Sequence, residues 1–178
     1  MKKIVIIISA VILSSLCFSC NNEQSLQSYL VESQEKPNFM SIDVPLSFIK
    51  LKTNKVSNEI KEAYKSIQKV NFIGLPYLNN EAAYEVEKKT LSTILRNSKS
   101  FKNLMKMDVK GMNISIYSNG DSDAIDEVIV FGYSEEVGVG VARILGKNMN
   151  PAKIMQMLEY LKIDPKQFNL QQFNLSFK

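Results

Sequence analysis

Histidine and tryptophan do not occur in this chain of 178 residues, and its two cysteines, Cys17 and Cys20, both lie near the N-terminus. Without histidine there is no Ser-His-Asp triad, no imidazole acid–base group and no histidine-ligated metal. Without a thiol beyond residue 20, that part of the chain has no cysteine nucleophile, no zinc-thiolate site and no disulfide. Carboxylate, lysine, tyrosine and serine chemistry remains. We therefore expect a protein that is not an enzyme and binds no cofactor.

A strong excess of one charge is lacking too. The chain has 22 basic and 18 acidic side chains, a formal net charge of +4, and the two signs alternate in stretches such as residues 57–69. Mixed charges of this kind are typical of a solvated surface, whereas a nucleic-acid-binding protein concentrates its cations on one stripe. We therefore expect no nucleic-acid partner.

The N-terminal apolar run is short. It covers residues 4–16, follows Lys2 and Lys3, and contains three serines. A membrane-spanning helix needs about 20 apolar residues, so this run is more typical of a secretory signal peptide.

The residues after this run, Leu16-Cys17-Phe18-Ser19-Cys20, resemble the lipobox of bacterial lipoproteins, with Ser19 as the small residue before the modified Cys20. The resemblance implies cleavage before Cys20 and attachment of acyl chains, which bind a membrane with roughly 0.8 kcal/mol per buried methylene. We thus expect a signal peptide over residues 1–19, a lipidated cysteine and tether over residues 20–38, and one domain over residues 39–178. An ordinary cleaved signal and an uncleaved signal anchor are the alternatives. An outer-membrane lipoprotein facing the periplasm is the expected location, with surface exposure open.

Hydrophobic periodicity predicts both helices and strands in the rest of the chain. Alternating or continuous apolar runs predict strands at residues 39–44, 70–75, 101–109, 112–117, 125–133 and 137–146. Helical spacing predicts helices after Ser57, Asn79 and Asn150, each of which is a favourable N-cap. In the second of these helices the predicted core residues are Ala83, Val86, Leu91, Ile94 and Leu95. Residues 21–38 are polar, and this polarity predicts a tether between anchor and domain. The alternative is that their one apolar patch, Tyr29-Leu30-Val31, packs on the domain.

Successive strands with short connections predict antiparallel pairing. The fold class we expect is α+β, a two-layer sandwich in which an antiparallel-rich β-sheet carries helices on one face. The segment after residue 163, rich in Gln and Asn, is either a docked tail or a final edge strand.

Three segments carry a family resemblance: FKNLMKMDVKGMNISIYS, AIDEVIVFGY and VGVGVARILGKNMNPAKIMQML. They resemble small lipoproteins of Bacteroidota that are catalogued as domain of unknown function 4252. The resemblance covers most of the chain after the lipobox and implies a shared fold and lipidation. It implies no catalytic or binding residues, because its motifs are strand and turn patterns.

The densest acidic cluster is Asp121, Asp123 and Asp126 with Glu127, next to the turn signal Asn119-Gly120. Oxygen ligands of this kind suit a weak Ca²⁺ loop, but the spacing departs from the EF-hand pattern. A soluble hairpin tip is the simpler interpretation.

Two further patterns have a structural and a functional interpretation. Gly138-Val-Gly140 is either a phosphate-binding turn or, as we expect, a place of close backbone packing in a strand. Five methionines either fill the core, as we expect, or line a ligand pocket together with Phe131. These methionines are Met105, Met107, Met112, Met155 and Met157.

The leading functional hypothesis is a lipid-anchored cell-envelope domain that binds another protein or an envelope component without catalysis. A small-ligand or lipid carrier with a pocket between sheet and helices is the second hypothesis. A hydrolase that uses two converging carboxylates is the third.

Overall fold

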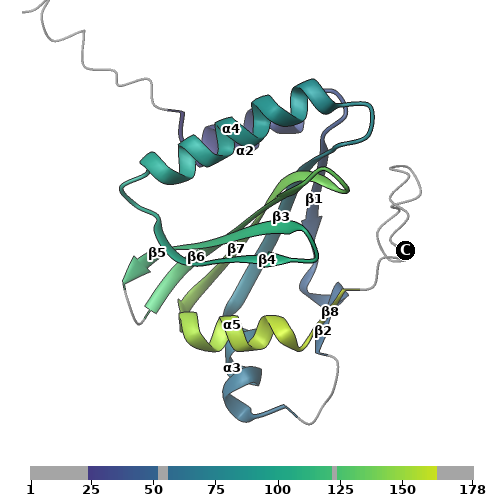
Figure 1. Cartoon of the computed structure of the whole chain (residues 1–178). Helices are drawn as coiled ribbons and strands as arrows, with labels where there is room; N and C mark the ends of the chain where they lie inside the picture. Colours follow the sequence, from purple (N-terminus) through teal and green to yellow (C-terminus); the bar gives the residue numbers. More distant parts are fainter. Residues whose placement is uncertain (1–23, 52–55, 122–123, 164–178) are drawn as a thin grey trace, which may run out of the picture.

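The computed structural model of the protein describes residues 24–51, 56–121 and 124–163 (Figure 1). Its centre is a six-stranded sheet in the order β1-β3-β7-β6-β5-β4, in which every neighbouring pair is antiparallel. The strands are β1 Met40–Val44, β3 Ile67–Pro76, β4 Lys102–Val109, β5 Met112–Asp121, β6 Ala124–Ser134 and β7 Gly138–Met149. Four of them, β4 to β7, follow one another as hairpins. The prediction of an α+β fold with an antiparallel sheet is confirmed.

The sheet is apolar on both faces. Ile73, Val141 and Phe131 lie side by side on one face, in register across β3, β7 and β6. Val128 and Ile144, which alternate with them along the strands, lie on the other face. Two separate clusters of buried side chains form on these two faces.

Each face is covered by its own pair of helices. Helices α2 (Leu26–Gln34) and α4 (Glu81–Asn97) cover the face of Ile73, whereas α3 (Asn58–Ser66) and α5 (Pro151–Glu159) cover that of Ile144. Figure 1 shows the two pairs on opposite sides of the sheet. The predicted arrangement with all helices on one face is therefore wrong, because the strands β6 and β7 are apolar at successive positions and both of their faces need cover.

A small second sheet lies beside α3. Strands β2 (Ile49–Leu51) and β8 (Leu161–Ile163) pair antiparallel, and the short 3₁₀ helix η2 (Leu46–Phe48) precedes β2. The Tyr64 hydroxyl lies 2.9 Å from the carbonyl oxygen of Leu46 and 2.7 Å from that of Ile49, which ties this segment to α3. The predicted tail or edge strand after residue 163 lies outside the described residues.

The predicted tether over residues 20–38 is wrong for residues 26–34, which form a helix packed on the domain. Helix α2 begins after Ser25, whose hydroxyl accepts a hydrogen bond from the Ser28 backbone N–H at 3.1 Å. Leu26, Tyr29 and Leu30 are buried in the same cluster as β3, β6 and β7. The alternative, in which this patch packs on the domain, is confirmed for Tyr29 and Leu30. The domain therefore begins before residue 39.

Candidate functional site

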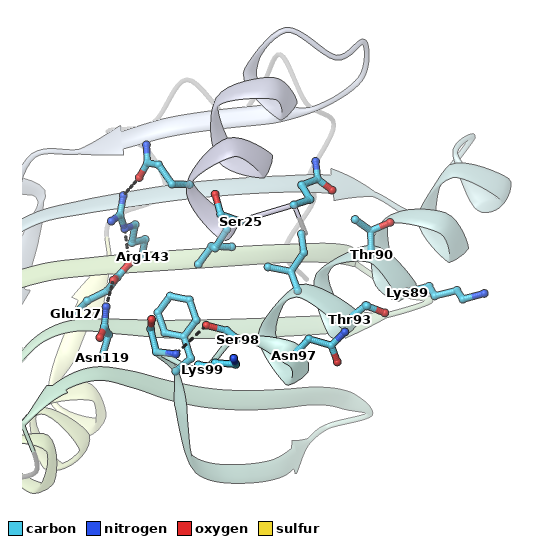
Figure 2. Close-up of a pocket in the computed structure, with 16 residues that line it drawn as sticks. Ser25, Lys89, Thr90, Thr93, Asn97, Ser98, Lys99, Asn119, Glu127 and Arg143 are labelled. Carbon is cyan, nitrogen blue, oxygen red and sulfur yellow. Dashed lines mark hydrogen bonds and ion pairs between the residues drawn. The ribbon is translucent and has the colours of Figure 1, made fainter. Parts of the chain in front are cut away.

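An open cleft lies where three parts of the fold meet: the start of α2, the C-terminal half of α4 with the loop that follows it, and the strands β5 to β7 (Figure 2). Its volume is about 820 Å³. This is large enough for a small-molecule ligand, since ligand pockets commonly have volumes of about 300–1,000 Å³. The cleft is the candidate binding site of the described chain.

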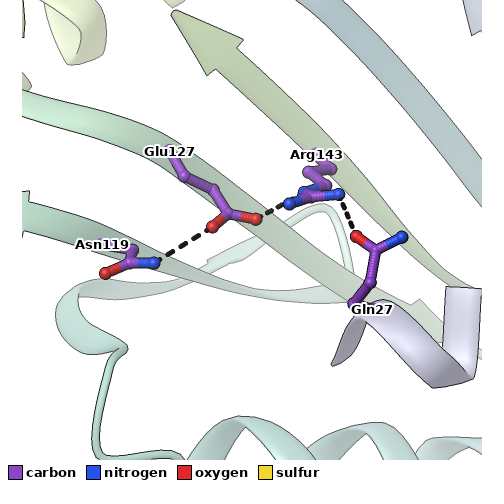
Figure 3. A network of polar contacts seen from close by, with 4 residues as sticks. All are labelled: Gln27, Asn119, Glu127 and Arg143. Atoms are coloured by element: carbon purple, nitrogen blue, oxygen red, sulfur yellow. Dashed lines mark hydrogen bonds and ion pairs between the residues drawn. The ribbon is translucent and has the colours of Figure 1, made fainter. Parts of the chain in front are cut away.

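The inner wall of the cleft carries a connected polar network (Figure 3). Arg143 Nε donates to Glu127 Oε1 at 2.5 Å, and Arg143 Nη1 donates to Gln27 Oε1, also at 2.5 Å. Asn119 Nδ2 donates to the second carboxylate oxygen of Glu127 at 3.3 Å. The network thus joins β5, β6 and β7 to the first turn of α2.

Strand register brings these side chains together. Asn119 lies directly opposite Glu127, while Arg143 lies opposite Ile129, two residues further along β6, so Glu127 and Arg143 form a diagonal cross-strand pair. A β-bulge between Ile125 and Glu127 also determines which face of the sheet these side chains lie on. It turns Ile125 toward the α3–α5 cluster and leaves Glu127 on the face of Ile129, which is covered by α2 and α4.

The cleft has a surplus of positive charge. Lys89, Lys99 and Arg143 line it together with one described carboxylate, Glu127, which leaves a local charge of about +2. Glu127 is already engaged by Arg143 and Asn119, and its side chain is only 9% exposed. The Arg143 side chain is 22% exposed. The available charge in the cleft is therefore cationic.

Neutral hydrogen-bonding groups surround these charges. Figure 2 shows hydroxyl and amide side chains from the N-cap of α2, from α4 and from the loop after α4, at Ser25, Thr90, Thr93, Asn97 and Ser98. Leu26, Ile94 and Phe101 supply apolar surface between them. Such a lining suits a ligand that combines hydroxyl groups with negative charge.

A second polar cluster joins α2 to α4 away from the cleft. Lys36 Nζ lies 2.8 Å from Glu87 Oε1 and 5.2 Å from the centre of the Tyr29 ring. Burial raises the pKa of the Tyr29 phenol far above its ordinary value, and the nearby Glu87 carboxylate raises it further. Tyr29 therefore stays neutral. We assign a structural role to this cluster, because it lies between two packed helices.

The acidic cluster predicted from the sequence is only partly described. Asp121 ends β5, Asp126 is exposed on β6, and Asp123 lies outside the described residues. The predicted tight turn at Asn119–Asp121 is wrong, because β5 continues to Asp121 and pairs with β6 on both sides of a bulge at Asp126. Within residues 24–51, 56–121 and 124–163, no group of three or more acidic side chains is placed to hold a metal ion.

The other predicted sites have different outcomes. Gly138 confirms close packing, since a Cβ there would lie 2.2 Å from the Leu75 carbonyl oxygen and its φ is +130°. Among the methionines, Met157 is buried with α5, whereas Met107 touches a second open hollow of about 600 Å³ that also reaches Phe131.

The predicted lipobox residues Ser19 and Cys20 lie outside the described residues. No helix in the described part of the chain is both long enough and apolar enough to cross a membrane.

Sequence reasoning did not identify Arg143 or Gln27 as site residues, and it counted Glu127 only as part of the acidic cluster. A signal does exist, because Arg143 and Glu127 each interrupt a nearly continuous apolar strand. A charged residue in such a strand needs a partner when the fold buries it. The sequence cannot show that the two residues are partners of each other.

Fold and site together define a single α+β domain with an open polar cleft at one end of an antiparallel sheet. The family described as Domain of unknown function (DUF4252) matches residues 29–157, and the chain belongs to this family. The match begins inside α2, in agreement with the packing of that helix in the core. No curated protein and no solved structure is similar enough to the chain to count as a match.

Proposed function

We propose that this protein is a binding domain of the cell envelope, without enzymatic activity, and that the cleft takes an anionic, hydroxyl-bearing head group at a membrane surface. Acyl chains on Cys20 hold the domain at the outer membrane in this proposal. The observation that carries it is the composition of the cleft: about two uncompensated positive charges among hydroxyl and amide groups.

The arrangement of the charges supports recognition of an anion. Arg143 is fixed by Glu127 and Gln27, so its guanidinium loses little further freedom when a ligand binds. Lys89 and Lys99 are exposed and line the cleft, where they attract a negative group from solution. The neutral groups of the cleft then provide hydrogen bonds for hydroxyl groups.

The position of the cleft supports a ligand at the membrane. Gln24, which lines the cleft, follows Cys20 by only four residues. Four residues of fully extended chain span at most about 14 Å. If Cys20 is lipidated, one wall of the cleft therefore lies within about 14 Å of the membrane surface, within reach of the head groups there.

A matched pair of sugars tests the charge requirement. Glucuronate and glucose share their ring hydroxyls and differ in one carboxylate, so we expect glucuronate to raise the melting temperature of the detergent-purified lipoprotein saturably and glucose to have little effect. The double variant Lys89→Gln/Lys99→Gln removes two exposed cations and is expected to weaken glucuronate binding about tenfold.

The control is the double variant Lys50→Gln/Lys61→Gln, which removes the same charge from exposed positions outside the cleft. It should bind glucuronate like the unchanged protein. Equal responses to the two sugars, or equal losses in both double variants, would contradict the proposed site.

A further inference from the structure

Strand β4 forms one edge of the six-stranded sheet. It pairs with β5 on one side, and no strand of the described residues pairs with its other side. Three of its apolar side chains are unusually exposed: Leu104 by 40%, Met105 by 39% and Val109 by 45%. An eight-residue edge with exposed apolar side chains offers unpaired backbone groups and apolar surface to another strand.

The last five residues of β4 form a pattern that is complementary to itself when two copies run antiparallel. Met105-Lys106-Met107-Asp108-Val109 reads apolar, cation, apolar, anion, apolar. Pairing with β5 places Met105, Met107 and Val109 on one face of the sheet, opposite Ile116, Ile114 and Met112. Lys106 and Asp108 point to the other face, opposite Ser115 and Asn113. The bulge of β4 lies before Met105, so these five residues form a regular strand.

We propose that two copies of this chain associate through antiparallel pairing of their β4 edges, with Met107 on the two-fold axis. In this register Lys106 of each copy lies opposite Asp108 of the other, and Met105 lies opposite Val109 of the other. The pair is isologous and closes on itself, so it joins two six-stranded sheets into one without further growth.

Charge complementarity selects a second copy as the occupant of this edge. The register forms two Lys106–Asp108 pairs across the interface, and opposite charges directly across an antiparallel pair are favourable. Lys106 makes no ion pair within the described chain. Asp108 accepts one hydrogen bond from the Gly111 backbone N–H at 3.0 Å and retains a second carboxylate oxygen for a partner.

The apolar face supports the same pairing. Met105, Met107 and Val109 of the two copies meet as one continuous strip, next to the half-buried side chains of Ile114 and Met112 on β5. Burial of exposed methionine and valine surface adds a hydrophobic contribution that the ion pairs alone do not supply.

Charge reversal tests both the interface and its register. Lys106→Asp places two aspartates opposite each other at each contact, and Asp108→Lys places two lysines there, so each variant should self-associate at least about tenfold more weakly than the unchanged lipoprotein. A mixture of the two variants restores opposite charges at both contacts and relieves the like-charge repulsion of each homodimer, so heterodimers should form in preference to either homodimer. Sedimentation equilibrium in detergent measures all three samples. The control, Lys61→Asp, reverses an exposed charge on α3 and should leave the dimer unchanged.

A cysteine cross-link tests the register independently of charge. The side chains at position 107 of the two copies face each other across the two-fold axis, so Met107→Cys should yield a disulfide-linked dimer when intact membranes are oxidised. Met105→Cys should not, because its symmetry mate is four residues away along the strand, about 13 Å. The unchanged chain, oxidised in the same way, reports any link through Cys17 or Cys20. A monomeric unchanged protein, failure of the mixed variants to associate, or equal cross-linking at positions 105 and 107 would overturn the proposal.

Discussion

At the scale of single residues, Glu127 and Arg143 show what a buried charge requires. The Glu127 carboxylate is almost fully buried, yet both of its oxygens accept hydrogen bonds, from Arg143 and from Asn119. Arg143 is less buried and has a second partner in Gln27. The arginine retains contact with solvent, whereas the carboxylate is almost fully buried. Removing the arginine should therefore destabilise the protein more than removing the carboxylate charge.

We expect Arg143→Met to destabilise the protein by about 3 kcal/mol, because it leaves the Glu127 carboxylate buried without its cation. Glu127→Gln should cost about 1–2 kcal/mol, since the amide oxygen still accepts from Arg143 but the amide NH2 group no longer accepts from Asn119. The double variant should be more stable than Arg143→Met alone, because it removes the buried charge together with its partner. Urea denaturation of the three variants measures these differences. A double variant that loses the sum of the two single effects would show that the residues are not coupled.

Residues on α4 show where helical periodicity predicts burial correctly and where it does not. Leu91, Ile94 and Leu95 are buried as predicted, but Ala83 is exposed and Val86 is 62% exposed. Tyr84 and Glu87 are buried in their place. The first turns of α4 face α2, and the nearby Lys36 is the partner of Glu87, which makes burial of a carboxylate possible.

At the scale of elements, α2 is the segment whose sequence predicts a tether and whose packing makes it part of the domain. Its buried residues Leu26, Tyr29, Leu30 and Ser33 follow the i, i+3, i+4, i+7 spacing of one helical face. The pattern is weak in the sequence because one of the four is serine and Val31 lies on the exposed face. The helix gains its stability from packing against α4 and the sheet, since nine residues are too few for an isolated helix in water.

Two adjacent apolar residues test whether α2 is packed on the domain. Leu30 is 6% exposed and Val31 is 53% exposed. We expect Leu30→Ala to lower the free energy of unfolding by about 2–4 kcal/mol, because it leaves a cavity in the core. Val31→Ala should change it by no more than about 0.5 kcal/mol. Thermal or urea denaturation distinguishes the two, and similar small effects at both positions would mean that residues 26–34 behave as a tether.

At the scale of the whole molecule, the proposed location of the domain at a membrane depends on lipidation of Cys20. Cys20→Ser removes the thiol that accepts the acyl chains in the proposed anchor, so we expect it to abolish incorporation of radiolabelled palmitate and to release the domain from membranes. Cys17→Ser is the matched control and should retain both properties. Labelling and membrane association that persist in Cys20→Ser would contradict lipidation at this residue.

The sequence by itself was sufficient for most of the secondary structure between Met40 and Glu159, because hydrophobic periodicity and the caps Ser57 and Asn150 are local properties. It was also sufficient for antiparallel pairing of β4 to β7, since short connections allow no other arrangement. Only the tertiary structure decided which helices cover which face, where α2 packs, and that Glu127 and Arg143 are partners across β6 and β7 while a bulge turns Ile125 to the other face. These features depend on contacts between residues far apart in the chain, such as Gln27 and Arg143, and local patterns carry no information about such partners.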